Sequence, residues 1–549
     1  MYIYSRQFHR DAYFVALILM AASLPLSRFA MSVMQFTLLG LWIWAGFSFK
    51  TVFDHFQKKG PKGIIWFLMY MGDLTSRNFL QKFRIFLKNK AALVLASLFL
   101  LHVAGLLHTS DFAYAMKDLR IKLPLLALPL IICSMPPLET KRFHQVMIFH
   151  LLAVMIGTFF STWELLQSEF TDIRGISVFI SPIRFSLNIC LAVFTSAYFA
   201  FRKHNLNLMT RALLFLSTAW LIYFLYLLES GIGLIIILGT GTLILVYLVI
   251  KQKKLVPKLL MILLVIGLPA FVILYTYNTI RDFNQVEKVN FEELDMFTKS
   301  GNKYYHDTVY MGIEDGKYCG LYLAPGELKK AWNKRSKLSY EGTDKKGQEL
   351  RVTLIRFLTS MDLRKDKEGV ESLTEDEIKA IERGIANVNY LNNPSLKTRI
   401  SKIMIGYHNY RYADDPNGSS VLQRIEYWKA SLSLIEENLL AGVGTGDLNK
   451  VFEEYYNKTN SPLSQKNRWR SHNQYLSIFI AFGVFGFAWF LFTLFYPPIR
   501  ERKFSDYFYF VFFMTIALSM LTEDTIETQA GVTLFAFFNS FLLFARKKE

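Results

Sequence analysis

The chain has 549 residues, of which 52% are hydrophobic and 16% aromatic, and its formal net charge at pH 7 is +18. The apolar residues fall in runs of roughly 18–22, the length that a helix needs to cross the hydrocarbon core of a bilayer. This distribution excludes a soluble globular protein. It predicts an all-α polytopic membrane protein whose partner is the lipid bilayer itself.

About twelve runs are predicted to be transmembrane helices. They lie at 11–27, 30–49, 91–108, 121–137, 144–163, 178–200, 210–228, 231–250, 257–276, 474–496, 507–522 and 530–545. We therefore expect transmembrane helices 1–9 in residues 1–277, a large polar domain in 278–471, and helices 10–12 in 472–549. The segment 64–90 is too polar for a span and is interpreted as an interfacial helix on the cytoplasmic face.

Lysine and arginine in the short connections give the orientation. The basic clusters are Lys58-Lys59 with Lys62, Lys141-Arg142, Arg202-Lys203, Lys251 with Lys253-Lys254, Arg500 with Arg502-Lys503, and Arg546-Lys547-Lys548. With twelve spans and a cytoplasmic N-terminus, all of them fall on the cytoplasmic side, as the positive-inside rule requires. Both termini are then cytoplasmic, and 278–471 lies on the outer side. The positive charge thus indicates orientation, and we expect no nucleic-acid partner.

The outer domain is predicted to be mostly helical with one small hairpin. Residues 308–323 form two β-rich runs around Asp315-Gly316, which is a hairpin pattern. Thr374 and Glu377 have the spacing of a capping box that opens a helix through about Gly384, and 350–363 is typical of another helix. Asp414-Asp415 can hold a divalent cation or form an Asx-type turn, and the turn-rich context favours the turn.

The end of this domain contains an amphipathic helix and a glycine-rich turn. One helix face is formed by Ile425, Trp428, Leu432, Ile435 and Leu439. Glycines at 442, 444 and 446 end this helix, and Asp447 is placed to cap the next one, 448–457. The glycine-rich turn can alternatively cradle a phosphate with backbone N–H groups, although a helix stop is favoured. No C-x-x-C or H-E-x-x-H spacing occurs, so no metal is expected.

His472 is the candidate catalytic residue. It follows Arg468 and Arg470, precedes Asn473, and is predicted to lie on the first turn of a span, at the membrane–water interface. The helix dipole and the two arginines disfavour its protonated form, which makes it a base for an acceptor hydroxyl. The alternative is an interfacial histidine that only anchors the span.

Other cations lie on the outer side, where the positive-inside rule leaves few. Lys122 and Arg120 precede the fourth span with Lys117, and Arg184 lies in the first turns of the sixth. Charges at membrane depth are functional candidates, although snorkelling to lipid head groups is an equal alternative. The nearby acids, which balance these cations or orient a base, are Glu229, Glu523, Asp524 and Glu527.

Two motifs resemble the O-antigen ligase and O-antigen polymerase superfamily of bacterial envelope proteins. Arg424 and Trp428, followed by G-V-G-T-G, are similar to the Arg-x-x-x-Trp helix and G-x-G-x-G of that family. His472-Asn473, followed by a span containing G-V-F-G, is similar to its His-Asn-x-x-Leu and Gly-x-x-Gly signature. The motifs cover about 424–490. Twelve spans with one large late outer loop are similar to the ligase branch.

The resemblance implies a glycosyltransferase of the bacterial inner membrane with its active site facing the periplasm. Its donor is a glycan on undecaprenyl pyrophosphate, its acceptor a lipid A–core sugar or a protein hydroxyl, and it uses no cofactor and no metal. His472 and Arg424 would be catalytic. Substrate binding would fall to the remaining candidates, namely Arg120, Lys122, Arg184, Arg470, Asn473 and Trp428.

One departure from the family concerns an arginine. Ligases often carry Ser-Arg-Gly at the outer start of a mid-chain span, whereas this chain has Leu228-Glu229-Ser230-Gly231. Either Arg184 or Arg120 substitutes, or the donor site differs. Two other functions are open: a polymerase that extends the lipid-linked glycan, and a flippase or transporter of lipid-linked sugars. Transport is disfavoured because the polar residues gather at one interface and the outer domain is asymmetric.

Overall fold

The computed structural model describes residues 2–59, 63–167, 173–201, 206–309, 311–391 and 396–547. About 74% of the chain is helical, in agreement with the predicted all-α class. The chain divides into two compact units. Unit 1 comprises residues 1–244 and 423–549, and unit 2 comprises 245–422.

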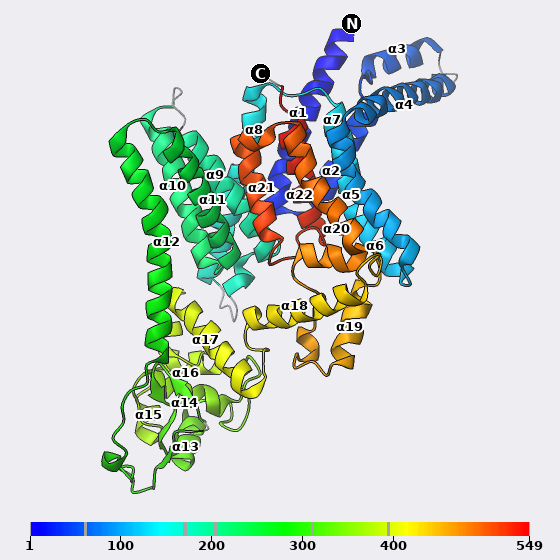
Figure 1. Cartoon of the computed structure of the whole chain (residues 1–549). Coiled ribbons are helices and arrows are strands. Elements are labelled where there is room, and N and C mark those ends of the chain that lie inside the picture. Colours follow the sequence, from blue (N-terminus) through cyan, green and yellow to red (C-terminus); the bar gives the residue numbers. More distant parts are fainter. Residues whose placement is uncertain are drawn as a thin grey trace. The chain divides into compact units, whose positions relative to one another are not determined.

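Unit 1 is a bundle of helices (Figure 1). It contains α1 (Tyr2–Leu26), α2 (Arg28–Ile43), α3 (Phe49–Lys59), α4 (Gly63–Lys88), α5 (Lys90–Ala104), α6 (Phe112–Lys122), α7 (Pro124–Ser134), α8 (Thr140–Gln167), α9 (Pro182–Phe201), α10 (Leu208–Leu227), most of α11 (Gly231–Lys251), most of α18 (Ser420–Glu437), α19 (Leu448–Lys458), α20 (Gln474–Arg500), α21 (Tyr507–Ser519) and α22 (Gln529–Phe544). One apolar core joins these helices except α3 and α4, and its fully buried side chains include Trp42, Phe143, Phe224, Phe490 and Phe512.

Seven helices within the described residues are long and apolar enough to cross a membrane. They are Lys90–His108, Thr140–Gln167, Pro182–Phe201, Leu208–Leu227, Gly231–Lys251, Leu255–Asn284 and Gln474–Arg500, and shorter apolar helices are Arg28–Ile43, Tyr507–Ser519 and Gln529–Phe544. Each predicted span overlaps one of these helices or α1 or α7. The chain is thus a multi-pass membrane protein by composition, while the number of twelve crossings stays a prediction. Of the basic residues used for orientation, Lys62, Arg202, Lys203 and Lys548 lie outside the described residues.

Unit 2 contains the long helix α12 (Leu255–Asn284) and a small domain of helices and short strands. Its elements are β1 (Tyr305–Asp307), β2 (Ile313–Glu314), β3 (Lys317–Tyr318), β4 (Gly320–Leu323), α13 (Pro325–Arg335), α14 (Leu350–Ser360), α15 (Lys367–Glu371), α16 (Glu375–Glu382) and α17 (Leu396–Ala413). The strands form two antiparallel pairs, β1 with β4 and β2 with β3. The core of this domain is built around Trp332 and Phe357.

Local predictions for unit 2 are confirmed where the pattern was strongest. The strands β2 and β3 flank Asp315-Gly316 as a hairpin, and Thr374 with Glu377 forms the capping box of α16. The Asp414-Asp415 segment is a turn, in which the carboxylate of Asp415 accepts hydrogen bonds from the backbone and side-chain N–H groups of Asn417. A second strand pair was not predicted, because strands of two to four residues leave little periodic signal.

The helix α18 positions the candidate site. It lies crosswise below α20, α21 and α22, at the end of unit 1 away from the two chain termini (Figure 1). Its buried side chains include Tyr427, Ala430, Leu434 and Ile435. The connection from α21 to α22 and the segment before α20 both reach this end of the bundle, so three parts of the sequence meet there.

The apolar face predicted for α18 is only partly buried. Ile425 is 38% exposed, Leu432 is 56% exposed and Leu439 is 50% exposed. Ile435 of the same face is buried, and the helix packs on the unit through this residue together with Tyr427, Ala430 and Leu434. Apolar spacing alone therefore does not identify the side of this helix that contacts protein.

Candidate functional site

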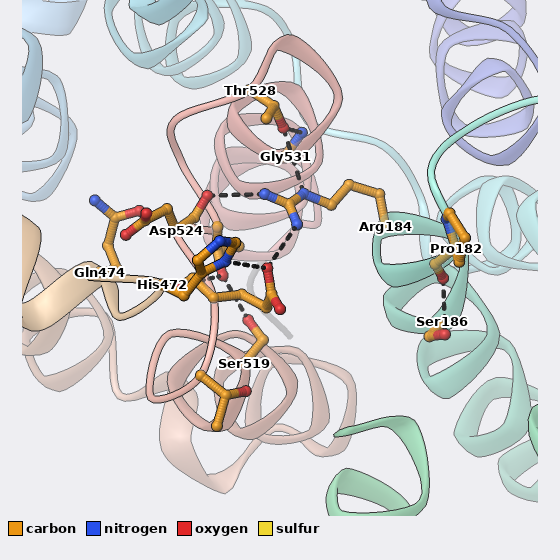
Figure 2. A network of polar contacts seen from close by, with 12 residues as sticks. Pro182, Arg184, Ser186, His472, Gln474, Ser519, Asp524, Thr528 and Gly531 are labelled. Carbon is orange, nitrogen blue, oxygen red and sulfur yellow. Dashed lines mark hydrogen bonds and ion pairs between the residues drawn. The ribbon is translucent and has the colours of Figure 1, made fainter. Parts of the chain in front are cut away.

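Two arginines and His472 converge on the carboxylate of Glu523, in the connection between α21 and α22. Arg424 of α18 donates from Nη2 to Glu523 Oε1 at 2.7 Å. Arg184 of α9 lies with Nη1 3.5 Å from Glu523 Oε2, and His472 Nδ1 lies 3.6 Å from the same oxygen. Figure 2 shows Arg184 reaching from its helix toward this connection, with His472 on the other side. We call these four residues the Glu523 cluster.

Both arginines of the Glu523 cluster are also held by neutral acceptors. Arg184 donates to the carbonyl oxygen of Asp524 at 2.8 Å and to Thr528 Oγ1 at 3.3 Å (Figure 2). Arg424 donates from Nε to the carbonyl oxygen of Thr522 at 3.2 Å. The guanidinium groups therefore have fixed positions that do not depend on Glu523 alone.

Charge and exposure make the Glu523 cluster suited to an anion. Burial alone would raise the pKa of Glu523, but contact with His472 and the charges of Arg424 and Arg184 hold it below its usual range. Glu523 is therefore ionised at neutral pH, and two permanent cations share one carboxylate. The side chains of Arg424 and His472 are 26% and 34% exposed, so solvent or a substrate reaches this cluster.

A second, more deeply buried cluster forms around Glu527. Lys122 of α6 donates to Glu527 Oε2 at 2.9 Å and to Asp118 Oδ2 at 2.7 Å. Arg470 Nη1 lies 3.5 Å from Glu527 Oε2, and Gln474 donates to Glu527 Oε1 at 3.0 Å. These five residues are called the Glu527 cluster below. Two cations here face two carboxyl groups, so the charges balance.

The pKa shifts in the Glu527 cluster follow from its burial and its ion pairs. Burial alone would raise the pKa of Glu527, but Lys122 and Arg470 outweigh it and hold the pKa low. Lys122 is likewise buried, and the two acids beside it stabilise its charge. The side chains of Lys122 and Glu527 are 3% and 4% exposed. This cluster is therefore a mostly closed ion-pair network, of which Arg470 is 18% exposed. The Glu523 cluster is more open only at Arg424 and His472.

The connection between α21 and α22 is fixed to the start of α20 by further hydrogen bonds. The hydroxyl of Ser477 donates to Asp524 Oδ1 at 2.7 Å. The backbone N–H of Gln474 donates to the carbonyl oxygen of Met520 at 2.9 Å, and the N–H of Ile526 donates to Gln474 Oε1 at 2.8 Å. These bonds hold the connection that carries Glu523 and Glu527 against the segment that carries His472.

The local backbone places His472 outside the helix, not on its first turn as predicted. The helix α20 begins at Gln474, and Asn473 caps it by accepting hydrogen bonds from the N–H groups of Tyr475 and Leu476. His472 precedes the cap with a φ of +44°, a left-handed conformation that is uncommon for a residue with a side chain. This turn directs the imidazole away from α20 and toward Glu523.

Two aromatic residues of α18 support the imidazole. The ring of Tyr427 stacks on that of His472 with centroids 5.5 Å apart, and its hydroxyl donates to the carbonyl oxygen of Asn467 at 2.7 Å. The indole N–H of Trp428 donates to the carbonyl oxygen of Ser471 at 3.1 Å. The role of Trp428 in this structure is therefore to hold the chain immediately before His472.

The expected cationic surroundings of His472 are also wrong. Arg468 donates to Asn457 Oδ1 at 2.7 Å and to the carbonyl oxygen of Leu463, which fixes it to the end of α19. Arg470 belongs to the Glu527 cluster. The charged group beside Nδ1 is the carboxylate of Glu523, which favours a proton on Nδ1 and leaves Nε2 for an acceptor.

The glycine-rich turn is a packing junction. The N–H groups of Val443 and Gly444 donate to the carbonyl oxygens of Ile480 and Ala481 at 2.9 and 2.8 Å, so they are not available to a phosphate and the cradle alternative is wrong. A side chain at Gly442 would lie 2.4 Å from the backbone of Ala481. These contacts fix the end of α18 against α20, which changes direction at a non-helical glycine, Gly483.

Asp447 has a different role from the predicted one. It stands at the start of α19, but its side chain makes no cap hydrogen bond there. Its carboxylate instead accepts from the N–H groups of Ser110 and Asp111 at 2.7 and 2.8 Å and from the hydroxyl of Ser110. Asp447 thus ties the end of the α18 turn to the start of α6, the helix that carries Lys122.

The structure brings most of the predicted site residues together but sorts them into two groups. His472, Arg424 and Arg184 share Glu523, whereas Lys122 and Arg470 share Glu527. Arg120 is exposed, and no ion pair joins it to either acid within the described residues. Of the two arginines considered as substitutes for the missing Ser-Arg-Gly arginine, Arg184 is therefore the one in the cluster.

Sequence reasoning missed several supporting residues. Asp118 had a usable signal, because it stands four residues before Lys122 on one helix. Tyr427 and Gln474 had none, because a single tyrosine or glutamine inside an apolar run does not reveal its partner. Thr522 was also not predicted from the sequence. Within the described residues its Oγ1, like His472 Nδ1, is buried without a hydrogen-bond partner. Such atoms are rare in folded proteins. His472 belongs to the Glu523 cluster, and Thr522 directly precedes Glu523 in the chain.

The fold and the site together define a helical multi-pass membrane protein with a buried cation–acid site at one end of its bundle. Residues 373–491 match the family described as O-antigen ligase (Wzy_C), which confirms over this segment the resemblance to the O-antigen ligase and O-antigen polymerase superfamily. The matched segment contains Arg424 and His472, whereas Arg184, Glu523 and Glu527 lie outside it. No curated protein matches the chain.

Proposed function

We propose that the protein is a metal-independent glycosyltransferase of the O-antigen ligase type. It transfers a glycan from undecaprenyl pyrophosphate to a lipid A–core sugar, or to another hydroxyl acceptor, on the periplasmic face of the bacterial inner membrane. The observation that carries this proposal is the convergence of Arg184, Arg424 and His472 on one carboxylate. The O-antigen ligase match over 373–491 supports it, because that family comprises ligases and polymerases.

The reaction needs a base and a cationic site for the leaving group. The acceptor hydroxyl oxygen forms a bond to the anomeric carbon of the glycan, and the bond from that carbon to the pyrophosphate oxygen breaks. Both electrons of the broken bond leave with the pyrophosphate, and the hydroxyl proton passes to Nε2 of His472. Arg184 and Arg424 stabilise the charge on the leaving pyrophosphate, because a guanidinium group is permanently charged and donates two parallel hydrogen bonds.

In this proposal the cations of the two clusters have different roles in donor binding. Arg184 and Arg424 are both fixed by backbone carbonyls. Arg424 is 26% exposed and is therefore the arginine that a substrate reaches first, whereas the side chain of Arg184 is 7% exposed. Lys122 and Arg470 bind the donor only indirectly in this scheme, because they hold the loop that carries Glu523. Asn473 and Trp428 act in the same way on the segment before α20. The exposed Arg120 lies outside both clusters, where it contacts lipid head groups or the donor.

The orientation of the site is part of the proposal. Figure 1 shows the described ends of α1 and α22 at one end of unit 1 and α18 at the other. This arrangement supports both termini on the cytoplasmic side with the Glu523 cluster on the periplasmic side. The cluster then lies at the depth of lipid head groups, where the pyrophosphate of a membrane-anchored donor is found.

A transfer assay with purified protein tests the function. The full chain is combined with an undecaprenyl-pyrophosphate-linked glycan and a lipid A–core acceptor, and the ligated product is measured. Arg424→Lys keeps the charge but loses the fork, so transfer should fall about 10-fold or more. Arg77→Lys, at an exposed arginine of α4, is the matched control and should transfer at close to the wild-type rate. Unchanged transfer by Arg424→Ala would remove this residue from the site.

Deletion in the native host separates ligase from polymerase. A ligase deletion should remove all glycan from the acceptor and cause lipid-linked glycan to accumulate. Retention of acceptor that carries a single repeat unit would indicate a polymerase instead. Unchanged glycan on both lipid and acceptor would contradict both activities.

A further inference from the structure

We infer that Glu523 is an internal substitute for the donor pyrophosphate, which holds the two arginines in the empty site and is displaced when the donor binds. This inference rests on the proposed function, because it assumes an anionic leaving group at Arg184 and Arg424. It adds a step to that function. The donor must compete with a carboxylate that belongs to the protein itself.

The contacts of Glu523 are those that a phosphate would make. Its Oε1 accepts the 2.7 Å hydrogen bond from Arg424, and its Oε2 faces Arg184 at 3.5 Å. A phosphate oxygen prefers the same guanidinium donors. Carboxylate and pyrophosphate therefore compete for the same N–H groups, and both cannot occupy them at full strength.

The arginines do not need Glu523 to keep their positions. Arg184 is held by the carbonyl oxygen of Asp524 at 2.8 Å, and Arg424 by that of Thr522 at 3.2 Å. Neutral carbonyls orient a guanidinium group without cancelling its charge. When Glu523 leaves, the two cations remain aimed at the same point with their full charge available to the donor.

The acids near the cluster differ in how firmly they are held. Asp524 accepts a hydrogen bond from Ser477 at 2.7 Å, and Glu527 has Lys122 at 2.9 Å and Gln474 at 3.0 Å. Glu523 has one short contact, to Arg424, and two long ones at 3.5 and 3.6 Å. Glu523 thus has fewer short contacts than Glu527, and an incoming anion repels it at short range.

The displaced carboxylate keeps one partner. His472 Nδ1 faces the same Oε2 that faces Arg184, so loss of the arginine contacts leaves the imidazole as the remaining cationic or hydrogen-bonding group. A carboxylate in that place orients an imidazole and stabilises its charged form after proton transfer. Glu523 is therefore a positioning residue for His472 during transfer and a competitor of the donor before it.

These two roles predict opposite effects on binding and turnover in Glu523→Gln. The amide has the same shape and no charge, so it competes weakly for the arginines and donor KM should fall about 10-fold. The same variant should lose about 10²-fold or more in kcat, because a general base and its supporting group together typically contribute 10²–10⁴-fold. A purely structural role for Glu523 would lower kcat without lowering KM.

Glu527→Gln is the matched control, since it makes the same substitution four residues later in the same connection. This variant is expected to be less stable than wild type because it breaks a buried ion pair, so it is assayed well below its melting midpoint. There it should not lower donor KM, because Glu527 contacts Lys122 and Arg470 and neither Arg184 nor Arg424. Glu523→Asp keeps the charge on a shorter side chain. It should restore donor KM toward the wild-type value. That result would show that the negative charge at position 523, and not a change in folding, sets the affinity for the donor.

Binding of inorganic pyrophosphate to the purified full chain, at constant ionic strength, tests the competition directly. We expect Glu523→Gln to bind it about 10-fold more tightly than wild type, and Glu527→Gln to bind it like wild type. Equal or weaker binding by Glu523→Gln would overturn the inference and leave the proposed function standing. If neither wild type nor Glu523→Gln binds pyrophosphate or the lipid-linked donor, the proposed function itself fails.

Discussion

The Glu527 cluster makes a quantitative prediction about stability. Lys122→Met removes a buried cation that lies 2.9 Å from Glu527 and 2.7 Å from Asp118. Two acids then face Arg470 alone. Breaking a buried ion pair from one side typically costs about 3–5 kcal/mol, because an uncompensated charge stays behind in a low-dielectric site. Glu527→Gln should have a similar cost, since it leaves Lys122 and Arg470 with Asp118 alone.

The double variant Lys122→Met with Glu527→Gln should lose less stability than the sum of the two single variants. It restores the balance of one cation and one acid, and contacting residues typically couple by about 0.5–3 kcal/mol. The assay is thermal unfolding of the purified chain in one detergent for all variants. Lys117→Met, an exposed lysine on the same helix, is the control and should change the midpoint little. Additive losses in the double variant would refute the closed network.

Three further predictions concern topology, packing and pH. Reporter fusions after Lys254 and after Asn302 should report opposite sides of the membrane, and the same side for both would contradict the orientation. Gly442→Ala should destabilise the chain by about 1–3 kcal/mol more than Gly46→Ala, because both positions have positive φ but only Gly442 meets backbone within 4 Å; equal melting midpoints would show that the junction is not tight. Because the pKa of Glu527 lies below its ordinary value of 4.5, its contribution to stability is present above that value and is lost as the pH falls through the lowered pKa. The wild-type melting midpoint should therefore fall on acidification below about pH 4.5, and Glu527→Gln should show a shallower fall.

The sequence predicted those features that depend on composition and on local pattern. Apolar runs long enough to cross a bilayer identified the helices of the bundle, and the capping box and the Asp315-Gly316 hairpin followed from short-range rules. The candidate residues His472 and Arg424 came from their place in recognisable motifs. Each of these signals is contained in a few neighbouring residues.

The grouping of the charges was not predictable in the same way. Arg184 lies more than two hundred residues before Arg424 and Glu523 in the sequence. Only the packing of α9, α18 and the connection before α22 brings the three residues together. Spacing along one helix cannot report such contacts. The apolar face of α18 was likewise only partly informative, since Ile435 is buried but Ile425, Leu432 and Leu439 are exposed.

The most direct test of the account is the rate of glycan transfer by purified His472→Ala. The reaction uses the undecaprenyl-pyrophosphate-linked glycan and the lipid A–core acceptor, with protein shown to be intact by its thermal unfolding. We predict a loss of about 10²–10⁴-fold in transfer rate, with binding of the lipid-linked donor unchanged, because the arginines that meet the pyrophosphate are still in place. Transfer at the wild-type rate would contradict the account and leave His472 as an interfacial anchor only.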